Sequence, residues 1–297
     1  MNWKQKVNSA LEFTGFHLAK NDARSEAKKG PSDAKKAPMA VKVVEPAEVR
    51  PPADPAADRL LRQPIFVMSP VRSGSTLLRA LLNAHSLLHA PHELHIRRLR
   101  VEFGTGLAER AMAALGHNQA DLEHFLWDRV LHRELVRSGK SHIVDKTPAN
   151  AFAWERIAAC WPDARFLFLF RHPASIARSW HEADPVKRTP EEAAADALRY
   201  MKAVQRARKG LPGLTVRYED LTADPETQLR AICADLGIPY ESGMLRYGEQ
   251  SVITKGLGDW KDKIRSGEVQ PGRALPSPEE VPEILRPMCR RWGYLPS

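Results

Sequence analysis

The stretch Pro64–Arg79, PIFVMSPVRSGSTLLR, decides the fold of this 297-residue chain. An apolar run leads into a short polar turn and then into a segment of helical pattern from about Gly74, which predicts a buried strand, a tight turn and a helix. A helix start leaves backbone N–H groups without partners and carries a partial positive charge, so it binds anions. Four side chains of the turn can also donate to phosphate-type oxygens: Arg72, Ser73, Ser75 and Thr76.

This turn departs from the phosphate loop of nucleoside triphosphatases, G-x-x-x-x-G-K-[ST]. Gly74 and Thr76 match the last glycine and the hydroxyl of that motif. Ser69 replaces its first glycine, and Ser75 replaces its lysine. Because the lysine reaches the terminal phosphates of a bound triphosphate, these changes indicate an anion-binding loop that does not serve an ATPase.

A second strand-to-helix segment, Ala164–Pro173, also ends in a cation. Its apolar run predicts a strand buried on both faces and stops at Arg171, where a triphosphatase commonly carries a magnesium-binding aspartate. A cation at this position repels a metal ion and attracts another phosphate. Pro173 suits the first turn of a helix over Ala174–Trp180, which places Ser179 two turns further on.

From Pro64 onward, predicted strands alternate with predicted helices. The expected strands are Pro64–Ser69, His142–Asp145, Arg165–Phe170 and Leu214–Tyr218. The expected helices are Gly74–Ala84, Asp121–Arg137, Ala149–Cys160, Ala174–Trp180, Pro190–Lys209 and Pro225–Leu236. Such alternation predicts a three-layer α/β/α fold whose central parallel sheet binds ligands at the carboxyl ends of its strands.

Together these residues resemble the sulfotransferases that use 3′-phosphoadenosine 5′-phosphosulfate (PAPS), a family with a P-loop-like fold. The family's first signature, [PK]-x-[RK]-S-G-[ST]-[ST], is similar to the turn after the first strand. The resemblance implies that the 5′-phosphosulfate is bound by Arg72, Ser73, Gly74, Ser75 and Thr76. The second signature is an arginine that ends a strand with a serine eight residues later. It implies that Arg171 and Ser179 bind the 3′-phosphate.

Two further matches follow in the family's order. Thr215–Leu221, TVRYEDL, resembles the strand whose tyrosine lies near the adenine, which points to Tyr218. KGLGDWK, which begins at Lys255-Gly256, resembles the C-terminal element that closes over the 3′-phosphate. The resemblance spans roughly residues 64–263, so we expect a sulfotransferase domain at 59–297 after an N-terminal extension at 1–58.

The resemblance also suggests the catalytic residues. Lys146, just after a predicted strand, takes the place of the lysine that meets the transferring sulfuryl group, and Arg72 supports the leaving phosphate. Many relatives carry a histidine base after this lysine and threonine, where this chain has Pro148. Another branch uses a glutamate soon after the first helix, and Glu93 occupies that position. His92 and His95 are alternative bases, and an ion pair between Glu93 and an arginine such as Arg97 is the structural alternative.

The composition limits the remaining choices. The net charge of +9 favours anionic partners, but basic and aromatic residues are not interleaved as in nucleic-acid motifs. Without an apolar run of membrane-spanning length or a signal peptide pattern, and with three scattered cysteines, the chain is predicted to be cytoplasmic. Residues 1–20 could form an amphipathic helix that contacts a membrane surface, and 21–58 read as an Ala/Pro/Lys-rich flexible linker.

Several alternatives stay open at this stage. The spacing of His85, His89, His92 and His95 could gather imidazoles for zinc, although Pro91 interrupts any helix there and no metal is expected. A P-loop kinase or nucleotidase shares the fold, and a non-catalytic nucleotide-binding protein could retain it. The acceptor is expected to be a hydroxyl or amine on a carbohydrate, glycolipid or small metabolite, and the sequence does not choose among them.

Overall fold

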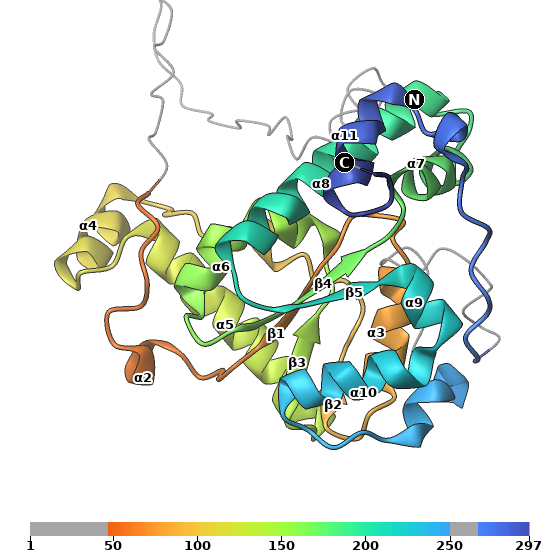
Figure 1. Cartoon of the computed structure of the whole chain (residues 1–297). Coiled ribbons are helices and arrows are strands. Elements are labelled where there is room, and N and C mark those ends of the chain that lie inside the picture. The colour runs from red at the N-terminus through yellow and green to blue at the C-terminus, as the bar shows by residue number, and fades with distance from the viewer. Residues whose placement is uncertain (1–46, 250–266, 297) are drawn as a thin grey trace, which may run out of the picture. The chain divides into compact units, whose positions relative to one another are not determined.

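A parallel sheet forms the centre of the protein. The computed structural model describes residues 47–249 and 267–296. Within them, five parallel strands pair in the order β2–β3–β1–β4–β5 (Figure 1). Their bounds are β1 Ile65–Met68, β2 Leu88–His89, β3 His142–Asp145, β4 Arg165–Phe170 and β5 Leu214–Arg217. The predicted α/β fold with a central parallel sheet is confirmed.

The strands contain continuous apolar runs because their side chains are buried on both faces of the sheet. Successive side chains of a strand point to opposite faces. In β4, Phe166, Phe168 and Phe170 pack into one hydrophobic cluster, whereas Leu167 and Leu169 pack into another. A strand whose odd and even positions are both buried has no polar face, which is why these segments read as continuous apolar runs.

Helices cover both faces of the sheet. Residues of α5, α6, α7, α8 and α11 contribute to the cluster that contains the β4 phenylalanines. Residues of α3, α9 and α10 contribute to the cluster on the opposite face. The bounds of these helices are α3 Ser75–Asn83, α5 Gln119–Ser138, α6 Trp154–Cys160, α7 Pro173–His181, α8 Pro190–Gly210, α9 Tyr218–Ala223, α10 Pro225–Leu236 and α11 Arg286–Arg291.

Local sequence signals account for several helix ends. Thr189 caps α8 through a reciprocal capping box with Glu192, and Pro190 fills the first helical position. Asn118 and Asp121 make the same arrangement at the start of α5. α7 begins at Pro173, one residue before the predicted start at Ala174, and Pro173 occupies its first turn as expected. The boundaries expected for α3, α5, α8 and α10 lie within two residues of those observed.

Other elements differ from the sequence prediction. The helix expected over 149–160 is divided into a 3-10 segment at Pro148–Phe152 and α6. Tyr218 was expected to end a strand but begins α9. The reason is that β4 ends at Phe170, so its pairing with Arg217 is the last between β4 and β5. The sequence prediction also omitted β2 and α4 (Gly106–Ala114), of which α4 has no buried residue.

The residues that precede the first strand contact the α/β body. Arg50 donates to Asp121 and to the Gly116 carbonyl, and a short helix, α2, follows at Pro55–Asp58. The predicted amphipathic segment and most of the predicted linker lie outside the described residues.

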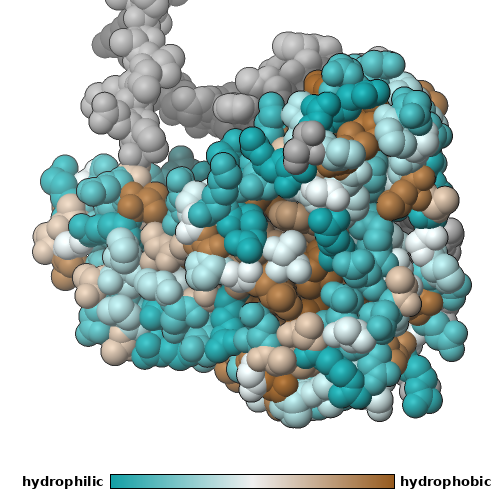
Figure 2. All heavy atoms as spheres, in the orientation of Figure 1, coloured by the Kyte–Doolittle hydropathy of each residue, from teal (hydrophilic) through white to brown (hydrophobic). Residues whose placement is uncertain are grey.

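On the face shown in Figure 2, hydrophilic residues surround a central group of hydrophobic ones. None of the described helices combines the length and apolar character needed to cross a membrane.

Asp128 provides a test of what stabilises the segment before β1. Its buried carboxylate accepts hydrogen bonds from the Leu60 and Leu61 amides and from the Trp161 indole, at 2.7, 3.2 and 2.9 Å. Asp128→Ala leaves three donors without this acceptor, so we expect a loss of about 2–5 kcal/mol in the free energy of unfolding. Urea denaturation measures the loss. Asp235→Ala, at an exposed helical position, is the matched control, and equal effects of the two substitutions would contradict the prediction.

Candidate active site

The loop between β1 and α3 forms the first part of the site. The backbone adopts left-handed conformations there, with φ of +67° at Arg72 and +89° at Gly74. The Ser73 hydroxyl donates a 2.8 Å hydrogen bond to the Pro70 carbonyl and closes the turn. α3 then begins at Ser75 with Gly74 as its N-cap. The N–H groups of the first helical turn therefore stand at the end of the loop, where an anion can be held.

The carboxyl end of β4 joins this loop. Arg171 follows the strand directly, and its Nη1 donates a 3.0 Å hydrogen bond to the Arg72 carbonyl. The Nε of Arg72 in turn lies 3.4 Å from the Ser179 hydroxyl on α7. The two segments that the sequence singled out, which are about 100 residues apart in the chain, thus meet at one edge of the sheet.

The two guanidinium groups are partly buried and close to each other. Burial lowers the pKa of Arg72, and the positive charge of Arg171 lowers it further. Burial also lowers the pKa of Arg171, where Tyr218 and Glu219 act in the opposite direction and Arg273 lowers it again. Arginine nevertheless stays protonated at neutral pH. The arrangement is a pair of desolvated cations, and a bound anion would relieve their mutual repulsion.

Tyr218 fills the space between the two segments. The Arg171 guanidinium lies over its ring, 4.3 Å from the centroid. A Cβ atom added to Gly74 would lie 2.2 Å from the Tyr218 Cδ2, so only glycine allows the ring to approach this closely. The tyrosine therefore supports both the helix start and Arg171.

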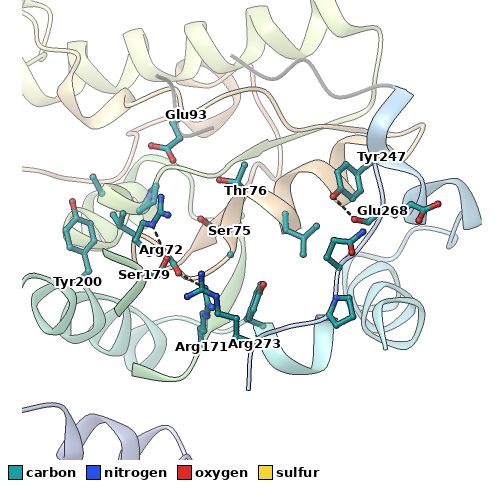
Figure 3. Close-up of a pocket in the computed structure, with 18 of the residues that line it drawn as sticks. Arg72, Ser75, Thr76, Glu93, Arg171, Ser179, Tyr200, Tyr247, Glu268 and Arg273 are labelled. Carbon is teal, nitrogen blue, oxygen red and sulfur yellow. Dashed lines mark hydrogen bonds between the residues drawn. The ribbon is translucent and has the colours of Figure 1, made fainter. Parts of the chain in front are cut away.

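A cavity of about 410 Å³ opens over this arrangement (Figure 3). The predicted residues among those that line it are Arg72, Gly74, Ser75, Thr76, Glu93, Arg171, Ser179 and Tyr218. Ser73, which belongs to the same loop, is fully buried and does not line the cavity. Lys146 is also absent from the lining, and its Nζ contacts Glu93, which lines the cavity. The cavity has the size of a small-molecule site.

A carboxylate on another part of the cavity wall contacts two basic side chains. Glu93 Oε1 lies 2.6 Å from the Nζ of Lys146, and Glu93 Oε2 lies 3.5 Å from the Nε2 of His95. Lys146 is almost completely buried, whereas His95 is half exposed. The alternative partner, Arg97, instead lies over the Phe152 ring, 5.8 Å from its centroid. Glu93 is therefore fixed by the lysine that follows β3.

Buried polar groups hold the end of β3 in place. Asp145 accepts hydrogen bonds from the Thr147 hydroxyl at 2.7 Å and from the Asn150 amide at 2.9 Å. Burial raises the pKa of Asp145, while these two hydrogen bonds act to lower it. The Thr147 hydroxyl also accepts a hydrogen bond from the His95 backbone amide. These contacts connect the segment that carries Glu93 to the segment that carries Lys146.

Two of the four histidines of the zinc alternative have separate partners. His85 is fully buried and accepts from the Leu87 amide at Nδ1, so its Nε2–H donates to the Pro239 carbonyl. His95 faces Glu93. Across the described ranges, no three His, Cys, Asp or Glu side chains are grouped so that they could hold a metal ion.

The C-terminal part of the chain adds residues that sequence reasoning missed. The additional lining residues from this region are Tyr247, Glu268, Gln270, Pro271 and Arg273. Tyr247 begins a short 3-10 helix and the other four lie in an irregular segment. None of them matches a motif, so no signal in the sequence marked them. Tyr200, from α8, lines the cavity as well. The predicted Lys255 and Gly256 lie outside the described residues.

The chain belongs to the sulfotransferase family. A model of this family (Sulfotransfer_3) matches residues 64–242, more than half of the chain. Two solved sulfotransferase domains share the fold. The domain from the curacin biosynthetic pathway has a TM-score of 0.58 and 21% identity, and covers 79% of this chain and 99% of its own length. The domain from the Synechococcus PCC 7002 olefin synthase has a TM-score of 0.55 and 22% identity, and covers 80% and 98%.

Two curated relatives match this chain over only part of their own length. The nodulation protein NoeE of Sinorhizobium fredii is 27% identical over 208 residues, which cover 58% of this chain and 49% of NoeE. A protein from Aquifex aeolicus is 26% identical over 211 residues, which cover 63% of this chain and 27% of that protein. The chain thus spans half or less of the length of these relatives.

The contact between Gly74 and Tyr218 yields a prediction with an internal control. Gly74→Ala combines an unfavourable φ with a collision against the Tyr218 ring. Gly139→Ala has a similar φ, +68°, but nothing lies within 4 Å of the added Cβ, so it reports the backbone strain alone. Strain costs about 1–2 kcal/mol. We expect Gly74→Ala to lose clearly more stability than Gly139→Ala in thermal unfolding, and equal losses would show that the ring moves away without cost.

Proposed function

We propose that this sulfotransferase moves a sulfuryl group from PAPS to a hydroxyl or amine of an acceptor. The observation that carries the proposal is the convergence of Arg72, Arg171 and the start of α3 on one cavity. At the end of β4, Arg171 stands where a nucleoside triphosphatase would carry a carboxylate that binds magnesium. A cation at this position favours a second phosphate, so the site favours a donor with two separate phosphate positions. The residues fit such a donor because desolvated arginines require anionic partners.

The loop and the second strand end would share the donor. We infer that Arg72, Gly74, Ser75 and Thr76 bind the 5′-phosphosulfate, with Ser73 closing the turn beneath them. Arg171 and Ser179 would bind the 3′-phosphate, and Tyr218 would hold Arg171 in place beside the adenosine. Lys255 and Gly256 stay predictions from the sequence.

The pair of Glu93 and Lys146 would perform the transfer. In the proposed reaction the acceptor oxygen or nitrogen attacks the sulfur as its proton passes to Glu93. The bond from sulfur to the bridging phosphate oxygen breaks, and 3′-phosphoadenosine 5′-phosphate (PAP) leaves with that electron pair. Lys146 and Arg72 would stabilise the oxygens that gain negative charge. Support for this assignment comes from the 2.6 Å contact, which places the Lys146 ammonium next to the Glu93 carboxylate that lines the cavity.

The acceptor and the cellular compartment belong to the proposal as well. We infer an acceptor on a carbohydrate, a glycolipid or a small metabolite, which enters beside Glu93, His95 and Tyr200. The reaction as proposed requires no metal ion. We place the enzyme in the cytoplasm, with peripheral membrane contact through the N-terminal residues.

Ligand-dependent unfolding tests the donor. PAP at 100 times its dissociation constant should stabilise the fold by about 2.7 kcal/mol, a rise of a few degrees in Tm. The rise should be independent of magnesium and should exceed that produced by ADP or ATP at the same concentration. A rise that occurs only with ATP and magnesium would instead identify a kinase.

Glu93→Gln tests the base. Loss of a general base typically reduces turnover by about 10²–10⁴-fold. We expect a loss in this range in PAP release from PAPS with methyl glycosides as acceptor probes, and nearly unchanged PAP affinity by calorimetry. Glu109→Gln, at an exposed position on α4, is the control. Turnover close to wild type in Glu93→Gln would transfer the role to His95 or His92.

A further inference from the structure

Arg273 lies at the cavity although it belongs to none of the recognised motifs. Figure 3 shows its side chain beside that of Arg171, although the two residues come from distant segments. The positive charge of Arg273 lowers the pKa of Arg171, as expected for neighbouring cations. Arg72, Arg171 and Arg273 thus supply three guanidinium groups to one cavity.

The backbone next to Arg273 is packed against the site. A Cβ atom added to Gly272 would lie 3.0 Å from the Thr222 hydroxyl and 3.8 Å from the Cε1 of Tyr218. The chain at this point therefore lies directly on α9, and the Tyr218 ring is also the one over which the Arg171 guanidinium lies. This packing fixes where the Arg273 side chain leaves the backbone.

A carboxylate at the edge of the site holds Arg273. Its Nη1 lies 2.8 Å from both carboxylate oxygens of Glu182. Glu182 follows the last residue of α7 and is three positions after Ser179, so the two side chains are neighbours on the helix surface. Arg273 is therefore held within about one helical turn of the Ser179 hydroxyl.

The ion pair between Arg273 and Glu182 is half exposed and close to other cations. The Arg273 side chain is 48% exposed and that of Glu182 is 35% exposed. Exposed pairs of this kind contribute little to stability. A phosphate monoester carries nearly twice the charge of a carboxylate and accepts two parallel hydrogen bonds from a guanidinium. A phosphate beside Ser179 can therefore compete with Glu182 for Arg273.

We propose that Arg273 is a further ligand of the nucleotide 3′-phosphate, and that Glu182 holds it beside this position until the phosphate replaces the carboxylate. This inference rests on the proposed function, because it assigns a residue to the 3′-phosphate of the same donor. Arg273 then helps to discriminate a 3′-phosphorylated nucleotide from one without that group. Glu182 weakens donor binding, since its contact must be broken first.

Calorimetric titration with PAP and with 5′-AMP tests this inference, because the two nucleotides differ only in the 3′-phosphate. Wild-type protein should bind PAP more tightly than AMP. Arg273→Gln should weaken PAP binding by about 10- to 100-fold, the range for loss of a charge-assisted hydrogen bond, and should leave AMP binding nearly unchanged. Arg273→Lys should fall between the two, because it keeps the charge but loses the fork of donors.

Glu182→Gln should have the opposite effect. Release of Arg273 should tighten PAP binding several-fold in the wild-type background and should not tighten it in the Arg273→Gln background. This double-mutant cycle separates the specific contact from a general gain in positive potential. The matched controls are Arg230→Gln and Glu226→Gln, which remove the same charges from an exposed ion pair on α10 and should leave the preference for PAP unchanged.

The outcomes separate this inference from the proposed function. A wild-type preference for PAP that survives Arg273→Gln in a folded variant would overturn the role of Arg273 and leave the donor assignment intact. A wild-type protein that does not distinguish PAP from AMP would overturn the donor assignment and this inference together. Equal tightening by Glu182→Gln in both backgrounds would overturn the exchange of Glu182 for phosphate.

Discussion

The hydrogen bond from Arg171 to the carbonyl of Arg72 is the contact on which the site depends. Arg72 has a left-handed backbone conformation, which is unfavourable for a residue with a side chain. The bond ties this strained residue to the end of the neighbouring strand. It can form because β1 and β4 are paired in parallel, so their carboxyl ends meet at the same edge. Sheet topology thereby fixes the local geometry of the loop.

Electrostatics explains why the cavity requires an anion. Arg72 and Arg171 are partly desolvated and face the same space, and Arg273 adds a third positive charge. The nearby carboxylates are engaged with other groups, Glu93 with Lys146 and Glu182 with Arg273. The lining thus offers the positive charge of three arginines toward the cavity, while the carboxylates of Glu93 and Glu182 are directed to specific cations. A ligand with two separate phosphate groups would match this distribution.

Rigid supports surround the polar groups of the site. Asp145 fixes the turn after β3 through Thr147 and Asn150, and the turn carries Lys146. Tyr218 packs against Gly74 and beneath Arg171. These residues occupy strand ends and helix starts, which are positioned by the core on both faces of the sheet. A site built in this way is more precise than one formed by exposed loops alone.

The sequence by itself determined four of the five described strands, most of the described helices and the two arginine-bearing turns. These features depend on local chemistry: apolar runs buried on both faces, caps such as Thr189 and Pro190, and a glycine at a helix start. Only the tertiary structure decided that Glu93 pairs with Lys146 rather than with Arg97, and that Arg273 joins Arg171. Such contacts join residues far apart in the chain, and their partners depend on how strand ends and irregular segments meet in space. No periodic pattern or motif records that arrangement, so it emerges only when the sheet brings the segments together.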